Sequence, residues 1–299
     1  MKLYAPTYYK KFKCIADRCE HSCCIGWEID IDEPTLEKYK NLKSGYGATI
    51  CHSIEWGETP HFRLCDGDRC PHLDEHGLCK IILGVGEAYL SDICREHPRF
   101  YNFTSVAEVG LGMSCPEAAR LILSYPDFAS MEEVGEVTVE PDGILFDGRA
   151  ERAKLYAVLQ EEKDYSLALK EIYDAYSIDA GEDSRWLQIL DSLEYLDAAH
   201  KELFLRYSSA LRPTGAEQEE YSKRFLAYLI YRHATEAVDE EDFATRLSFC
   251  LFCERLFASL LCTEGAQTLQ DAATLASILS EEIEYSDDNT WTLMRQRLL

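Results

Sequence analysis

The sequence lacks a long apolar run, and it has few basic residues. No stretch of its 299 residues approaches the roughly 18 apolar residues that a membrane-spanning helix requires. Residues 1–13 are too polar for the apolar core of a secretion signal. Lysine and arginine number 30 against 54 aspartate and glutamate residues, a net charge of −24. We therefore expect a cytoplasmic protein with neither a membrane nor a nucleic acid as partner, because nucleic-acid binding draws on basic side chains.

Several familiar motifs are also missing. Gly84-x-Gly86 has neither the third glycine nor the preceding strand of a dinucleotide-binding fingerprint. The cysteines before residue 116 form no paired Cys-x2-Cys knuckles, which are typical of zinc modules, and no ferredoxin-type run. The three-cysteine loop of radical S-adenosylmethionine enzymes is absent as well. These absences exclude the common modules but not a metal.

Cysteine is what the sequence has in abundance, with ten of its thirteen cysteines within the first 115 residues. An odd number of cysteines, a vicinal pair and an expected reducing compartment all disfavour disulfides. Thiolates are preferred ligands of zinc and of iron–sulfur clusters, and four satisfy either one. We therefore predict a metal site whose metal the spacing leaves open. Its candidate ligands are the eight cysteines of a spaced array: Cys14, Cys19, Cys23, Cys24, Cys70, Cys79, Cys94 and Cys115.

Other residues near the array have two interpretations. Trp27 could pack against the sulfonium or adenine of a cofactor, or brace the Cys23–Cys24 loop as a core aromatic residue. Four histidines could supply nitrogen ligands or hydrogen bonds to ligands, or be ordinary polar loop residues: His21, His72, His76 and His97. Cys250 and Cys253 lie on one face of an apolar helical pattern, which favours core packing over metal binding.

The patterns predict a mainly α fold with a few short β-strands. Residues 1–130 read as an irregular, cysteine-rich metal-binding module, packed on a helical domain in residues 131–299 that begins with a β-hairpin. Asp32 with Pro34 predicts a helix start, and a capping box from Ser114 to Glu117 predicts another. The hairpin would place Val137 and Val139 before the turn Pro141-Asp142-Gly143. Five later amphipathic helices are predicted around residues 155–159, 167–176, 186–196, 221–229 and 243–257.

Several multi-residue motifs follow one another in a characteristic order. They include Pro6-Thr7-Tyr8-Tyr9, Cys23-Cys24-Ile25-Gly26-Trp27, Ile29-Asp30-Ile31-Asp32, Cys70-Pro71-His72-Leu73, Leu90-Ser91-Asp92-Ile93-Cys94 and Ser114-Cys115-Pro116-Glu117. In this order the sequence resembles the flagellin lysine-N-methylase family, whose cysteine module also occurs in zinc- or iron-chelating proteins. His97-Pro98-Arg99 departs from the Phe-Pro-Arg expected there.

The resemblance implies methylation of lysine ε-amino groups of a protein, flagellin, by S-adenosylmethionine, with the array cysteines holding a 4Fe–4S cluster. The substrate amine must first lose a proton. The candidate acceptors are Tyr8, Tyr9, Glu28 and Asp30, which lie close in sequence to the cysteine motifs. Two alternatives stay open: a non-catalytic zinc- or iron-binding module for structure, storage or electron transfer, and an interaction protein whose acidic surface docks a basic partner.

Overall fold

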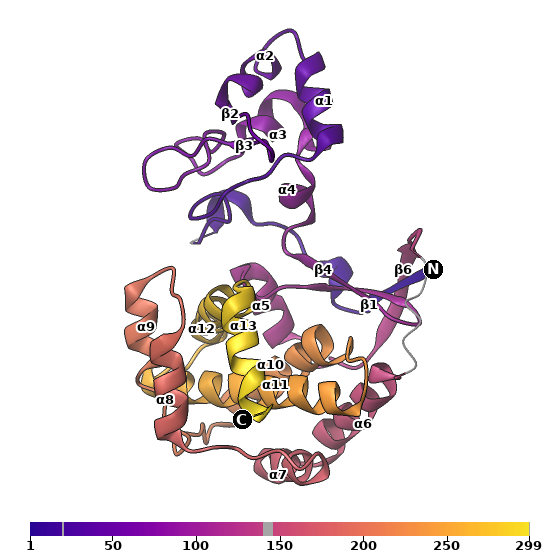
Figure 1. The fold of residues 1–299 in the computed structure, drawn as a ribbon, viewed down its shortest axis with the longest axis vertical. Helices are drawn as coiled ribbons and strands as arrows, with labels where there is room; N and C mark the ends of the chain where they lie inside the picture. Colours follow the sequence, from indigo (N-terminus) through magenta and orange to yellow (C-terminus); the bar gives the residue numbers. More distant parts are fainter. Residues whose placement is uncertain (20, 140–145, 299) are drawn as a thin grey trace. The chain divides into compact units, whose positions relative to one another are not determined.

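The computed structural model describes residues 1–19, 21–139 and 146–298. The chain forms two compact units, a helical unit of Met1–Phe12 and Phe100–Leu299 and a cysteine-rich unit of Lys13–Arg99 (Figure 1). Helices dominate and the strands are few and short, which confirms the predicted mainly α class. The division predicted between residues 130 and 131 stays a prediction, since compactness does not show which segments fold alone. None of the helices in the described ranges is long and apolar enough to cross a bilayer.

A four-stranded sheet belongs to the helical unit. Its order is β4 (Arg99–Phe103), β5 (Ala107–Leu111), β1 (Lys2–Pro6) and β6 (Met131–Glu136). β1 runs parallel to β5 and antiparallel to β6, so the first strand of the chain lies between two strands that follow more than a hundred residues later. Every residue of β5 is buried, whereas every residue of β6 is partly or fully exposed.

Nine α-helices complete the helical unit in the described residues. They are α5 (Pro116–Ser124), α6 (Gly148–Glu161), α7 (Tyr165–Ala175), α8 (Asp183–Ser192), α9 (Ala198–Phe204), α10 (Ala216–Leu229), α11 (Glu240–Thr263), α12 (Leu269–Leu279) and α13 (Asp287–Met294). π-Helical turns at Ile230–Ala234 and Ser280–Glu284 extend α10 and α12. The five predicted helices are confirmed as α6, α7, α8, α10 and α11; α9, α12 and α13 were not predicted.

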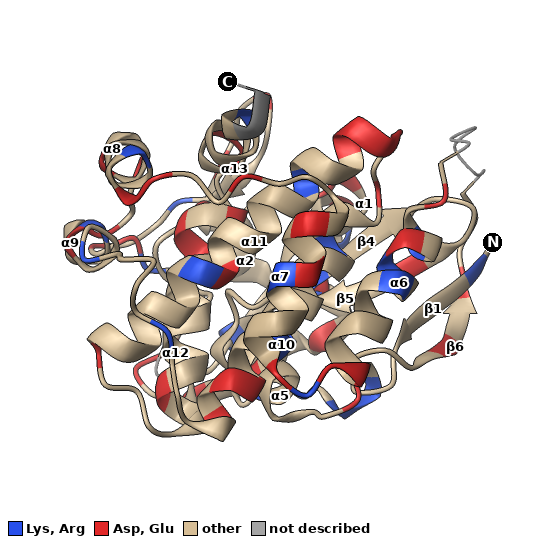
Figure 2. Ribbon diagram, turned by 90° about the horizontal axis from the view of Figure 1, so that it is seen from below, with Lys and Arg blue, Asp and Glu red and all other residues tan. Residues whose placement is uncertain are grey.

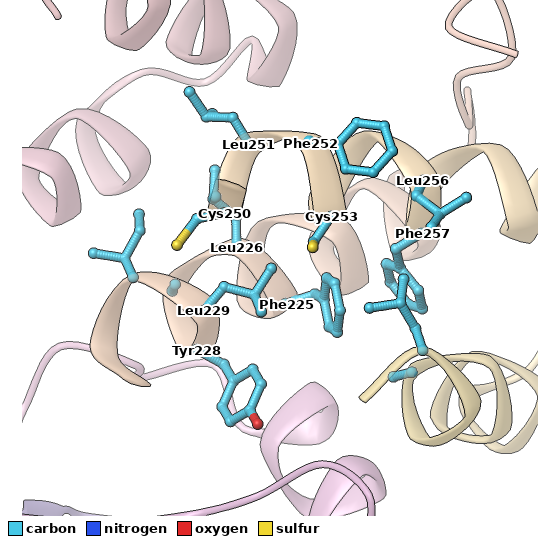
Figure 3. Packing of buried hydrophobic residues seen from close by; sticks show 14 of the residues in the cluster. Phe225, Leu226, Tyr228, Leu229, Cys250, Leu251, Phe252, Cys253, Leu256 and Phe257 are labelled. Atoms are coloured by element: carbon cyan, nitrogen blue, oxygen red, sulfur yellow. The ribbon is translucent and has the colours of Figure 1, made fainter. Parts of the chain in front are cut away.

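The core of the helical unit is built around α11, which packs along α10. Cys250 and Cys253 of α11 are fully buried and point toward Phe225, Leu226 and Leu229 of α10 (Figure 3). Burial raises the pKa of both thiols well above the ordinary value. The expectation that this cysteine pair serves core packing is therefore confirmed.

The surface and the interior of the helical unit differ in how their charged residues are arranged. Acidic positions are spread over the helices and outnumber basic ones (Figure 2). Four carboxylates of the described residues are nevertheless buried, and each has a basic partner: Glu108 with Arg152 (2.7 Å), Glu254 with Arg212 (2.8 Å), Glu282 with His200 (2.7 Å) and Glu284 with Arg232 (3.3 Å). Pairing of this kind keeps a charge in an apolar interior tolerable.

Two local predictions for the helical unit need correction. The N-cap of α5 is Cys115 rather than Ser114, and its side chain makes no capping hydrogen bond. The predicted capping box is wrong because Glu117 instead pairs with Arg120 at 2.6 Å. Val137 and Val139 follow β6 outside any strand, and the predicted hairpin turn at Pro141-Asp142-Gly143 lies outside the described residues.

The cysteine-rich unit consists of short elements around a small core. Its helices are α1 (Glu33–Asn41), α2 (Gly47–Ile50), α3 (Lys80–Val85) and α4 (Asp92–Glu96), and its strands β2 (Ile54–Glu55) and β3 (His61–Phe62) pair antiparallel. The Asp32 carboxylate accepts a hydrogen bond from the Thr35 amide at 2.9 Å, with Pro34 in the first turn, which confirms the predicted start of α1. The core contains Ile29, Ile31, Tyr39, Ile50, Ile54 and Phe62.

Candidate metal centre in the cysteine-rich unit

Four array cysteines come from four separate segments, each held in place by local structure. The Cys70 amide donates to the Cys24 carbonyl at 2.9 Å, which fastens their two loops together. Cys79 is the N-cap residue of α3, and Cys94 lies within the short helix α4. All four pack against the small core, with Cys70 only 6% exposed.

The four thiols also influence one another's ionisation. Burial, followed by the charges of neighbouring thiolates, raises the pKa of Cys70 to about 12 and that of Cys94 to about 11, and raises the pKa of Cys79. The Cys24 thiolate contributes to all three increases, and the other three thiols interact with each other. Every pair among the four therefore interacts electrostatically, and all four thiols pack against the same small core.

Cys24 behaves differently from the other three. A hydrogen bond from the Cys23 thiol makes the largest contribution and lowers the pKa of Cys24 to about 7, helped by the Ser22 hydroxyl and the charge of Arg69. In the metal-free protein Cys24 therefore ionises first, while Cys70 and its neighbours keep their protons. Metal binding must displace those protons, since thiolates rather than thiols are the ligands.

The spacing of the sulfur atoms bears on which metal group fits. Within the described ranges, no three cysteine sulfurs all lie within 4.8 Å of one another. A tetrahedral zinc ion, with Zn–S distances of about 2.3 Å, would hold its sulfurs about 3.8 Å apart. A 4Fe–4S cluster binds each thiolate at a different iron and therefore spans a wider set. The choice between a zinc ion and a 4Fe–4S cluster at these thiols therefore stays a prediction.

The other four predicted ligands have different surroundings. The exposed Cys14 accepts a hydrogen bond from the Ala16 amide at 3.4 Å, and the Cys19 thiol donates to the His21 carbonyl at 2.9 Å. Cys23 is exposed beside Cys24, and Cys115 belongs to the helical unit. The structure therefore gathers Cys24 and its three partners, whereas ligation by all eight cysteines stays a prediction.

The aromatic and histidine candidates have identifiable neighbours. The Trp27 indole N–H donates to the Cys23 carbonyl at 2.6 Å, a contact that braces the loop. His72 is buried with both ring nitrogens in contact with hydroxyls, from Tyr46 at 2.5 Å and Ser53 at 2.8 Å, so neither is available to a metal. The ring of His97 lies 6.1 Å from that of Trp27. His21 and His76 are exposed.

The predicted proton acceptors fall in different units. Tyr8 is buried in the core of the helical unit, and burial raises its pKa far above the ordinary value, so its hydroxyl stays protonated and is disfavoured as an acceptor. Tyr9, also in the helical unit, is half-buried. Glu28 and Asp30 are exposed on the cysteine-rich unit. The structure adds His61 beside these two carboxylates, a neighbour that sequence reasoning missed.

Part of the amino-acid sequence is similar to two kinds of Salmonella protein. A lysine-N-methylase of Salmonella typhimurium is 30% identical over 139 residues, which are 43% of this chain and 34% of that protein. The flagellar biosynthetic protein FliU of Salmonella muenchen is 30% identical over 139 residues, which cover 80% of FliU. The matched region thus spans about a third of the length of the lysine-N-methylase. No family model and no solved structure matches the chain.

Proposed function

Because the chain belongs to the family of FliU and the lysine-N-methylases, we propose that it methylates lysine side chains of a protein, with S-adenosylmethionine as the methyl donor. Flagellin is the proposed substrate, since one relative is named for lysine methylation and another for flagellar biosynthesis. The observation that carries the proposal is the family relation, together with a cysteine centre of the kind that the resemblance implies.

The proposed cofactor is a 4Fe–4S cluster held by the thiolates of Cys24, Cys70, Cys79 and Cys94. Held by four thiolates, such a cluster would have no open iron position, so it would carry an electron or stabilise the irregular unit rather than act as a Lewis acid. Arg69 already lowers the pKa of Cys24 through its charge and would offset part of the thiolates' negative charge. The small core behind the thiols excludes water from one side of the group.

The proposed reaction sets clear demands on the substrate. The neutral lysine nitrogen attacks the methyl carbon, a C–N bond forms, the C–S bond of the sulfonium breaks, and the proton of the amine passes to an acceptor. The protein must therefore bind the substrate lysine and provide an acceptor for the proton of its ammonium group. The net charge of −24 attracts basic, lysine-bearing partners over distances of about 10 Å at moderate salt.

The test is transfer of label from methyl-labelled S-adenosylmethionine to flagellin by anaerobically prepared protein. We expect transfer by the unaltered chain, loss of transfer in Cys70→Ser and retention in Cys65→Ser, because Cys70 is buried in the centre and Cys65 is exposed outside it. No transfer by protein with a loaded centre would contradict the proposal. That result would favour a non-catalytic metal-binding role, which is the second candidate because the match covers only 34% of the lysine-N-methylase.

A further inference from the structure

A short extended segment of the cysteine-rich unit alternates strictly between buried and exposed side chains. Ile29 and Ile31 are 1% and 4% exposed and belong to the small core, so Glu28 and Asp30 project to the opposite, outer side. The backbone is fixed on both sides of Asp30, since the Phe62 amide donates to the Ile29 carbonyl at 3.0 Å and the Ile31 amide donates to the Pro60 carbonyl at 2.8 Å. The two carboxylates therefore stand on a well-anchored frame.

His61 completes a cluster of three ligand-type side chains on this frame. It lies directly opposite Asp30 in an antiparallel bridge, and one ligand atom each from Glu28, Asp30 and His61 lie within 4.8 Å of one another. The Nδ1 atom of His61 is 3.3 Å from the Glu28 carboxylate and 3.1 Å from the Thr59 carbonyl. Nδ1 is therefore the ring nitrogen that faces the Glu28 carboxylate, and a metal ion bound there would replace its contact with the Thr59 carbonyl.

The negative charge of this cluster has no fixed counter-charge nearby. Within the described part of the chain, neither Glu28 nor Asp30 forms an ion pair with a lysine or an arginine, and the imidazole of His61 is their one basic contact. Many other carboxylates of the chain pair with basic side chains, including the exposed Glu37, which contacts Lys40 at 2.6 Å. Two close carboxylates without such a partner favour the binding of a cation.

We propose that Glu28, Asp30 and His61 bind a divalent first-row metal ion of the kind that prefers oxygen and imidazole ligands, such as Mn²⁺. Metal–ligand distances of about 2.0–2.2 Å require only a small contraction of the cluster, and the exposed Glu28 side chain can rotate to supply it. Three protein ligands leave coordination positions open for water or for an oxygen atom of a partner. Because the ligands contain no sulfur, this site and the thiol centre would select different metals.

A substrate lysine is the competing occupant of this site, and the chemistry disfavours it. Carboxylates close to an ammonium group stabilise its charged form and so raise its pKa. Methyl transfer needs the neutral amine, so a pair of carboxylates at the reacting nitrogen would oppose the reaction. A metal ion gains from the same two charges without this penalty. The proposal is therefore independent of the proposed methyltransferase function.

The experiment is a titration of the full chain with Mn²⁺, with free ion measured by electron paramagnetic resonance. The thiol centre is loaded beforehand, and Mn²⁺ is used because thiolates bind it poorly. We expect one Mn²⁺ per chain, with the affinity reduced more than about tenfold in Asp30→Asn and in His61→Gln. His52→Gln and Glu58→Gln change exposed residues of the same types outside the cluster and should leave binding unchanged.

Two results would overturn the proposal. One is the absence of bound Mn²⁺, or equal binding by Asp30→Asn, His61→Gln and the controls. The other is binding of a lysine peptide that depends on Asp30 and His61 in protein that binds no Mn²⁺, which would assign the site to an ammonium group. If either variant fails to fold by circular dichroism, Glu28→Gln replaces it, because the Glu28 side chain is 60% exposed and contributes little to folding.

Discussion

In the metal-free protein, Cys24 should react with an alkylating agent long before Cys70 does. Hydrogen bonding from Cys23 lowers the pKa of Cys24 to about 7, whereas burial raises that of Cys70 to about 12. At pH 7 about half of Cys24 is thiolate, against about one part in 10⁵ of Cys70. The more basic thiolate is intrinsically more reactive, by about two orders of magnitude at a Brønsted slope of 0.4–0.5. Cys70 should still react about 300-fold more slowly.

The assay is alkylation with iodoacetamide between pH 5 and pH 9, followed by peptide mass spectrometry of protein stripped of metal under reducing conditions. The modification rate of Cys24 should rise through a midpoint near pH 7. Cys23→Ala removes the hydrogen-bond donor and should move this midpoint up toward the ordinary thiol pKa of about 8.5. Cys23→Ser keeps a donor and should move it less. The exposed Cys65 reports reagent access in every sample.

This reasoning would be refuted by either of two observations. The first is a midpoint for Cys24 that does not change in Cys23→Ala, which would mean that the neighbouring thiol does not control ionisation. The second is alkylation of Cys70 as fast as that of Cys24, which would mean that the four thiols are not buried together.

Two further predictions concern the helical unit. Arg152→Met removes the closer of two basic partners of Glu108, which is 1% exposed, and leaves Arg149 at 3.4 Å. Because Arg149 offsets part of the loss, we expect a cost of about 2–4 kcal/mol of unfolding free energy and a melting midpoint lower by roughly 4–16 °C. The exposed Lys154→Ala should cost less than about 0.5 kcal/mol, and equal losses in thermal unfolding would contradict this. A hydrogen bond to Glu282 raises the pKa of His200, so its stabilisation is complete below the ordinary value of 6.5 and is lost as the pH rises through the raised value. His200→Gln should therefore abolish this loss of stability on going from pH 5.5 to pH 8, and an unchanged pH profile of unfolding would show that the pair does not contribute.

Local signals can predict a helix start when the deciding contact lies within the same few residues. Asp32 caps α1 through the amide of Thr35, only three residues away, so the local sequence was sufficient to predict this start. The start of α12 carries an equally local signal, a capping box between Thr268 and Asp271, which sequence reasoning missed. The box expected from Ser114 failed because Glu117 found a better local partner in Arg120, a competition that a motif does not reveal.

The site depends on contacts that sequence spacing does not contain. Cys24 and Cys70 are joined by a backbone hydrogen bond across 46 positions, so the array alone could not select four cysteines from eight. His61 lies opposite Asp30 because two segments far apart in the sequence pair, and the short strand that alternation predicts at Phe62 does not reveal its partner. The resemblance predicted a cysteine site without its ligand set, and the structure adds that Cys24, Cys70, Cys79 and Cys94 pack against one small core.

The most direct test of the central claim is the iron and acid-labile sulfide content of anaerobically prepared protein, measured with matched cysteine variants. About four irons and four sulfides per chain are expected. The content should fall in Cys24→Ser, Cys70→Ser, Cys79→Ser and Cys94→Ser and be retained in Cys65→Ser and in Cys262→Ser of the helical unit. One zinc with no iron, or equal losses in all six variants, would contradict a cluster held by these four thiolates.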